Sequence, residues 1–110
     1  MPILNLDKLF YPRSVAVVGA CNREGMPGSV VMHNLLQGGF EGPIMPVSGS
    51  DRAIAGVLAY PRIDDLPITP DLAVICSPVP SASQVIHALG ERGTRAAILL
   101  ADGADPAVGA

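Results

Sequence analysis

The residues best suited to chemistry lie between Gly19 and Ser29. Gly19 ends an apolar run, and nine residues that include Gly25 and Gly28 follow before a helical pattern begins. A glycine at the end of a strand lets the backbone approach a ligand closely. The free N–H groups and the dipole at the start of a helix favour a phosphate. This interval therefore predicts a phosphate-binding loop.

The loop does not have the dinucleotide-binding pattern G-x-G-x-x-G. That pattern would place glycines at positions 19, 21 and 24, where the chain has Gly19, Cys21 and Glu24. The second predicted strand also lacks the acidic residue that holds a ribose, because it ends in Val47 and Ser48. The sequence therefore does not support NAD, and the longer loop suits a bulkier or more extended phosphorylated ligand.

The elements that must position this loop alternate between apolar runs and helical patterns. Strands are predicted at 14–19, 43–48, 56–60, 71–77 and 95–101. Helices are predicted at 28–37 and at 81–92, which opens on a capping box, and 62–66 predicts a helical turn. Continuous apolar runs are typical of strands buried on both faces. This order predicts an α/β fold of the Rossmann-like, doubly wound type with a mainly parallel sheet.

Three loops of such a sheet meet at one edge. Right-handed crossovers place the ends of the strands 14–19 and 71–77 beside each other. Ligands of these folds bind at the carboxyl ends of the strands, near the switch in strand order. The loops 19–28, 48–52 and 77–81 are therefore the predicted binding loops.

Composition limits the classes of function. The 110 residues predict one domain, and 49% are hydrophobic while 15% are charged. A net charge of -3 and 4% aromatic residues argue against a nucleic-acid binder. No apolar run suits a membrane span, and the apolar N-terminus contains Asp7 and Lys8 and lacks a cleavage site, so we expect a cytoplasmic protein. The last predicted strand has no helix after it, so residues 1–110 are expected to be one domain, truncated at the C-terminus, of a longer protein.

No group of residues predicts catalysis by this chain alone. Cys21 and Cys76 match no metal-ligand spacing, and His33 and His87 fall in the middle of predicted helices. The sequence contains no nucleophile with a base, no P-loop and no cluster of metal ligands. The chain is therefore expected to bind a ligand rather than to catalyse a reaction.

Several motifs, taken in order, resemble a known family. They are "PRSVAVVGA" at 12–20, "NLLQGGFEGPIMPV" at 34–47, "GVLAYPRIDDLP" at 56–67 and "DLAVICSPVP" at 71–80. Together they are similar to the CoA-binding domain of NDP-forming acyl-CoA synthetases, which the succinyl-CoA synthetase α subunit shares. Three segments, at 38–47, 56–76 and 90–100, look closest to protein lysine acetyltransferases that fuse this module to a GNAT domain.

The resemblance implies a site for CoA or acetyl-CoA along the three loops, with ATP or ADP used in other domains of the parent protein. The implied cofactor-binding residues are Gly19, Ala20, Cys21, Asn22, Arg23, Gly28, Ser29, Val47, Ser48, Ser77, Pro78, Val79 and Pro80. The family commonly has serine at the position of Cys21 and asparagine-proline at Ser48-Gly49. At these positions the resemblance therefore implies contacts by the backbone rather than by the family's side chains.

Three hypotheses follow. The first is a CoA-binding domain whose parent either makes acyl-CoA with nucleotide hydrolysis or transfers acetyl groups to protein lysines. The second is an NAD(H)-binding regulatory or oxidoreductase domain, and the third is a degenerate scaffold kept for dimerisation or for docking the other parent domains. The sequence leaves open the acyl group, the nucleotide, the protein substrate and the oligomeric state.

Overall fold

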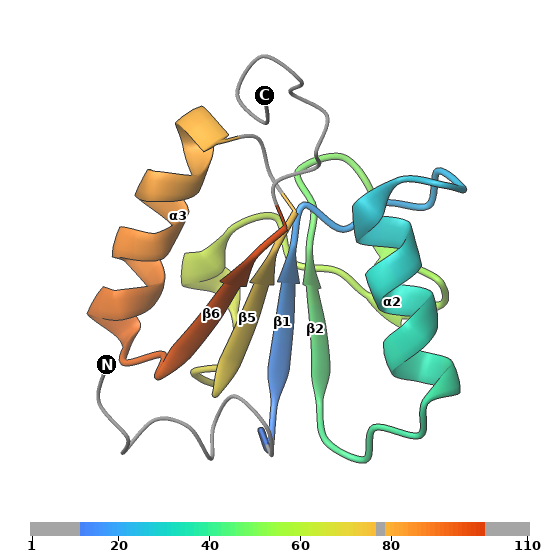
Figure 1. The fold of residues 1–110 in the computed structure, drawn as a ribbon, viewed down its shortest axis with the longest axis horizontal. Coiled ribbons are helices and arrows are strands. Elements are labelled where there is room, and N and C mark those ends of the chain that lie inside the picture. The colour runs from blue at the N-terminus through green and yellow to red at the C-terminus, as the bar shows by residue number, and fades with distance from the viewer. Residues whose placement is uncertain (1–11, 77–78, 101–110) are drawn as a thin grey trace.

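The fold is a small parallel sheet with helices on both sides (Figure 1). The structure is a computed structural model that describes residues 12–76 and 79–100. Its elements in chain order are β1 (Val15–Val18), α2 (Pro27–Gln37), β2 (Ile44–Val47), β3 (Ala53–Ile54), β4 (Val57–Leu58), the 3-10 turn η2 (Ile63–Asp65), β5 (Leu72–Ile75), α3 (Val79–Arg92) and β6 (Ala96–Leu99).

The sheet has the order β2-β1-β5-β6, and its neighbours pair in parallel. Val18 at the end of β1 is level with Val47 of β2 on one side and with Ile75 of β5 on the other. The predicted adjacency of the first strand and the strand after position 70 is therefore confirmed. The strand order switches at β1, so the loops after β1, β2 and β5 share one edge.

Two hydrophobic clusters lie on opposite faces of the sheet. Val15 and Val17 point into one cluster, which Met32 of α2 and Ile54 of β3 complete. Ala16 and Val18 point into the other cluster, with η2 and α3 against them. The continuous apolar run of β1 is therefore buried on both faces, as the sequence predicts.

The predicted strand 56–60 forms in part, at Val57–Leu58, outside the four-stranded parallel sheet. Its core, β4, pairs only with β3, in a separate antiparallel hairpin. The two residues between them, Ala55 and Gly56, have positive φ angles of 52° and 85°, which is the twist of a tight two-residue hairpin turn. The turn reverses the chain, so β4 pairs with β3, and the chain meets the edge of the parallel sheet at Tyr60, which makes an isolated parallel bridge with Val47 of β2.

Two other expectations need correction. Helix α3 begins at Val79, so Ser81 lies in its first turn and not at its N-cap. Pro80 suits this first turn, because the main-chain N–H that proline lacks has no hydrogen-bond partner within the helix there. Strand β6 is not buried on both faces, since Ile98 and Leu99 are 36% and 40% exposed. β6 is an edge strand, and within the described residues its outer part is uncovered.

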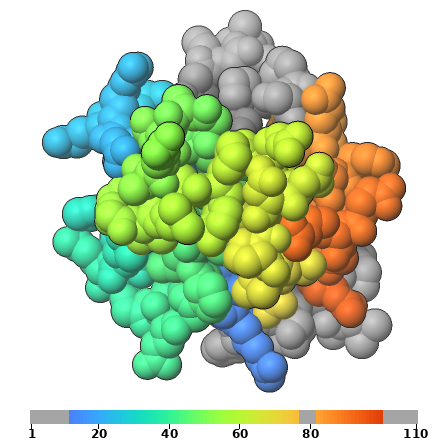
Figure 2. All heavy atoms as spheres, turned by 180° about the vertical axis from the view of Figure 1, so that it is seen from behind, coloured from blue at the N-terminus to red at the C-terminus, as the bar shows by residue number. Residues whose placement is uncertain are grey.

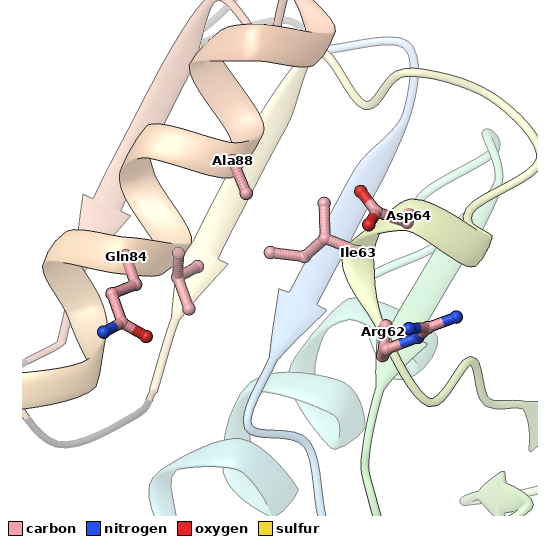
Figure 3. Close-up of a pocket in the computed structure, with 6 residues that line it drawn as sticks. Arg62, Ile63, Asp64, Gln84 and Ala88 are labelled. Atoms are coloured by element: carbon pink, nitrogen blue, oxygen red, sulfur yellow. The ribbon is translucent and has the colours of Figure 1, made fainter.

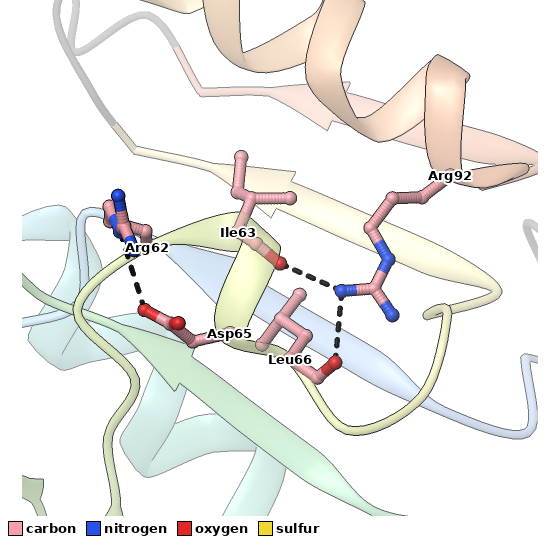
Figure 4. A network of polar contacts seen from close by, with 5 residues as sticks. All are labelled: Arg62, Ile63, Asp65, Leu66 and Arg92. Atoms are coloured by element: carbon pink, nitrogen blue, oxygen red, sulfur yellow. Dashed lines mark hydrogen bonds and ion pairs between the residues drawn. The ribbon is translucent and has the colours of Figure 1, made fainter.

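The connection from β2 to β5 crosses the back of the molecule, where it appears in green to yellow (Figure 2). Arg92 at the end of α3 fixes this connection. Its Nη1 donates to the carbonyl oxygens of Ile63 at 2.8 Å and of Leu66 at 2.9 Å (Figure 4). The neighbouring Arg62–Asp65 ion pair, at 3.5 Å, is largely exposed and adds little. Neither described helix has the length and apolar character that a bilayer crossing requires.

Candidate functional site

The loop after β1 is closed onto the end of β2. Gly19 has a φ of 85°, a conformation that glycine adopts without strain. The N–H groups of Gly19 and Ala20 both donate to the carbonyl oxygen of Val47, at 3.1 and 3.3 Å. These two donors are therefore engaged within the chain, and ligand contacts by Gly19, Ala20 and Val47 stay predictions. Main-chain donors for an anion would have to come from farther along the loop.

Helix α2 starts directly against this turn. A Cβ atom on Gly28 would collide with the carbonyl oxygen of Gly19 and would lie 2.9 Å from Cα of Ala20. Only glycine permits this packing, which is the role of the last glycine in a dinucleotide-binding turn. Gly19 and Gly28 therefore serve as two glycines of the G-x-G-x-x-G pattern do, at the turn and at the close helix contact, but at a wider spacing.

The start of α2 is open to an anion. Pro27 occupies its first turn, and the N-cap residue Met26 makes no side-chain cap. The first turn contains no acidic residue that would repel a phosphate. The N–H of Ser29 donates to the carbonyl oxygen of Met26 at 3.0 Å, and its side chain is half-buried beside the loop. The electrostatics at this helix end therefore favour negative charge.

Asn22 joins the loop to the hairpin. Its Nδ2 donates to the carbonyl oxygen of Ala53 at 2.9 Å and lies 3.4 Å from Oδ2 of Asp51. Its Oδ1 accepts the N–H of Ala55 at 3.0 Å. Asn22 therefore uses its amide within the chain, although a ligand contact by its main chain stays a prediction.

Ser48 organises the loop after β2. Its Oγ accepts the N–H groups of Ser50 at 3.3 Å and of Asp51 at 3.1 Å, and its own N–H donates to the carbonyl oxygen of Tyr60 at 2.9 Å. The residue is 9% exposed. Ser48 therefore shapes its turn, as asparagine or serine does when it bonds main-chain N–H groups two or three residues ahead.

The two cysteines lie close enough to interact. Cys76 follows β5, and its N–H donates to the carbonyl oxygen of Val18 at 2.8 Å, next to the loop that contains Cys21. Burial, and secondarily the thiolate charge of Cys21, raise the pKa of the Cys76 thiol from its ordinary 9.0 to about 11. Both cysteines are free thiols, and this environment keeps Cys76 protonated at neutral pH.

The structure describes only some of the remaining predicted cofactor-binding residues. Arg23 is exposed on the loop, and its carbonyl oxygen accepts the N–H of Met26 at 3.2 Å. Val79 and Pro80 begin α3. Ser77 and Pro78 lie outside the described residues, so their predicted role is unchanged.

One hollow lies beside the loop after β1, and a second lies between η2 and α3. One, of about 490 Å³, is lined by Asn22, Glu24, Gly25, Ser29, Val30, His33 and Asn34, between the loop and the outer side of α2. The other, of about 190 Å³, is lined by Arg62, Ile63, Asp64, Gln84, Val85 and Ala88 (Figure 3). Within 12–76 and 79–100, no three His, Cys, Asp or Glu side chains gather as metal ligands would.

The hairpin's contact with the loop after β1 was not predicted from the sequence. The β3 strand is two residues long, and Asn22 and Ala55 are 33 residues apart. The one local signal is Gly56, which follows Ala55 and could mark a tight turn.

Comparison with protein families identifies one matching family model. Residues 13–110 match the family described as "CoA binding domain". Curated relatives are consistent with this match. The chain is 38% identical, over 101 residues, to an ADP-forming acetate–CoA ligase of Archaeoglobus fulgidus and 35% identical, over 98 residues, to a trans-feruloyl-CoA synthase. The match to the acetate–CoA ligase covers 92% of this chain but only 15% of the ligase.

Solved structures show the same relation. A protein of Pyrococcus horikoshii superimposes with a TM-score of 0.82 at 30% identity, over 93% of this chain and 23% of that one. An acetyl-coenzyme A synthetase of Candidatus Korarchaeum cryptofilum, in complex with phosphate and ADP, superimposes with a TM-score of 0.79 at 36% identity. That match covers 84% of this chain and 20% of the synthetase.

Proposed function

Because this chain belongs to the CoA-binding domain family and is related to ADP-forming acetyl-CoA synthetases, we propose that it binds CoA or acetyl-CoA at the carboxyl edge of its sheet. The ADP part of the ligand lies over the loops 19–28 and 48–52. The pantetheine arm extends beyond this edge toward the catalytic domains of a longer parent protein.

The packing of Gly28 on Gly19 is the observation that carries the proposal. It brings the first turn of α2 to the end of β1, with no side-chain cap and no acidic residue there. A pyrophosphate at this point would meet the positive end of the helix dipole and main-chain N–H groups. The N–H groups of Gly19 and Ala20 are already engaged by Val47, so the donors are those of the segment 21–25 and of Gly28.

Exposed arginine and buried serine complete the proposed site. Arg23 is exposed on this loop, and a guanidinium can pair with two phosphate oxygens. Val47 ends β2 next to β1 and Ser48 follows it, so these two residues are the proposed floor under the adenosine. Ser77, Pro78, Val79 and Pro80 stay predicted ligand contacts, and a proline-rich segment loses less freedom when a ligand binds.

The parent protein is proposed to be an ADP-forming acyl-CoA ligase. The relatives with this domain are acetate–CoA ligases and a feruloyl-CoA synthase, and the chain spans 15% of the first of them. A GNAT-fused lysine acetyltransferase stays a prediction from the segments at 38–47, 56–76 and 90–100. Sequence beyond residue 110 would decide, since an ATP-grasp domain without a GNAT domain supports the ligase.

Isothermal titration calorimetry of the 110-residue chain tests the binding proposal. We expect CoA and acetyl-CoA to bind with similar affinity, because the acetyl group lies beyond the site, and ADP to bind more weakly. Arg23→Ala should weaken CoA binding. Arg95→Ala removes the same charge from an exposed position before β6, at the other end of the sheet, and should leave CoA binding unchanged.

The same titration distinguishes the CoA-binding proposal from the NAD(H)-binding and scaffold hypotheses. Tight NADH binding without CoA binding would replace the proposal with a dinucleotide-binding domain. No heat with CoA, acetyl-CoA, ADP or NADH would replace it with a scaffold.

A further inference from the structure

Asn22 lies at the junction of two walls of the proposed CoA site. The loop after β1 contains Asn22, and the loop after β2 continues into the hairpin β3–β4. Figure 2 shows the light-blue loop after β1 at the same end of the molecule as the green segment after β2. A ligand that bridges these loops would depend on the distance between them.

The hairpin side of this junction is fixed to the sheet. The N–H of Ala59 donates to the carbonyl oxygen of Arg52 at 2.8 Å, and that of Tyr60 donates to the carbonyl oxygen of Pro46 at 2.9 Å. Ile54 is fully buried against the α2 face of the sheet. The hairpin is therefore a rigid extension of β2, and its turn offers a fixed set of main-chain groups.

The side chain of Asn22 matches these groups in both polarity and position. Its Nδ2 meets the carbonyl oxygen of Ala53 at 2.9 Å, and its Oδ1 meets the N–H of Ala55 at 3.0 Å. The second contact is made to the residue with a φ of 52°, a conformation that costs energy for a residue other than glycine. Such a conformation persists only where surrounding contacts hold it. Asn22 is therefore matched to this one arrangement of the turn.

We propose that Asn22 is a positioning residue, which sets the gap between the loop 19–28 and the hairpin β3–β4 and so preorganises the CoA site. The proposal rests on the proposed function. Its physical basis is that a loop held in its bound conformation before the ligand arrives loses less freedom on binding. Asn22 contacts the hairpin, and its effect on the ligand passes through the loop.

The first test compares Asn22→Ala with Gln37→Ala. Gln37 carries the same amide group on the exposed last residue of α2, away from the loop. In Asn22→Ala we expect the CoA dissociation constant to rise roughly tenfold, the effect of about 1.4 kcal/mol. Hydrogen exchange at the Ala55 amide should accelerate, while exchange in β1 and β5 stays as in the unmodified chain. Gln37→Ala should change neither quantity.

The second test separates positioning from direct contact. Ala55→Pro removes the N–H that Asn22 accepts and cannot adopt a positive φ, so it breaks the junction and leaves the Asn22 side chain in place. A positioning role predicts a similar loss of CoA affinity and a double variant no weaker than either single one, because both changes break the same contact. Full CoA affinity in Ala55→Pro, with a loss in Asn22→Ala, would overturn the proposal in favour of direct contact.

Should Ala55→Pro fail to fold, the exchange measurement on Asn22→Ala decides alone. An unchanged Ala55 exchange rate, or unchanged CoA affinity in Asn22→Ala, would overturn the positioning role. The unmodified chain distinguishes the two proposals. If it does not bind CoA, the proposed function fails, whereas the junction itself is still judged by the exchange of the Ala55 amide.

Discussion

Replacing Gly28 by alanine should damage both the stability of the chain and its affinity for CoA. The new Cβ would lie 2.9 Å from Cα of Ala20 and collide with the carbonyl oxygen of Gly19. These are main-chain atoms, which cannot rotate away as a flexible side chain could. Carbon atoms normally pack at about 3.5 Å or more, so the start of α2 must retreat by at least about 0.6 Å, the difference between 3.5 and 2.9 Å.

Overpacking of this kind costs about 1–3 kcal/mol. Helix propensity offsets little of this cost, because Gly28 lies in the first turn and not in the helix interior. Each kcal/mol lowers the Tm of a small domain by roughly 4–8 °C, so the Tm of Gly28→Ala should fall by at least about 4 °C. Since the helix end moves away from Gly19, CoA affinity should fall as well.

Differential scanning calorimetry and CoA titration of Gly28→Ala measure the two effects. Gly90→Ala is the matched control, because a Cβ on Gly90 meets no atom within 4 Å and the residue lies inside α3. There the substitution should stabilise the chain by up to about 1 kcal/mol and leave CoA binding unchanged. A Gly28→Ala chain with unaltered Tm and unaltered CoA affinity would refute the close packing and the site built on it.

Three further predictions follow from the contacts described above. Ala55→Asn should stabilise the chain by about 1 kcal/mol in urea denaturation, because asparagine tolerates the positive φ of this turn better than alanine does; equal or lower stability would contradict the strain assigned to Ala55. Arg92→Ala should destabilise the chain by about 1.5–3 kcal/mol, since it removes a charged donor shared by two carbonyl oxygens. Glu91→Ala is the control and should change stability little, because it loses only an exposed pair with a histidine. Similar effects of the two changes would count against the role of Arg92. The pKa of Cys76, raised from 9.0 to about 11, means that the folded chain holds this proton more tightly than the unfolded chain. The resulting stability is fully present below pH 9 and is lost as pH rises through 11. Iodoacetamide labelling of Cys76, followed by peptide mass spectrometry, should be slow at neutral pH and accelerate toward pH 11; rapid labelling at neutral pH would show that burial does not protect this thiol.

Much of the fold could be predicted because its signals are local. The uninterrupted apolar residues of β1 and β5 indicate strands covered on both sides, and the two clusters on opposite faces of the sheet confirm this. The glycines after α2 end the helix as expected, with the N–H of Gly38 donating to the carbonyl oxygen of Asn34. The hairpin could not be predicted, because its strands are two residues long and too short for a pattern.

By itself, the sequence determined the order of the four parallel strands and the two helices, the glycine turn after the first strand and the resemblance to CoA-binding domains. These features depend on residue types and on spacings within one element. Only the tertiary structure decided that Gly28 packs on Gly19, that Asn22 bonds to a turn 33 residues away and that Cys76 lies near Cys21. Such pairs arise where crossover connections return distant segments to one edge of the sheet, and no local pattern in the chain specifies which side chains meet there.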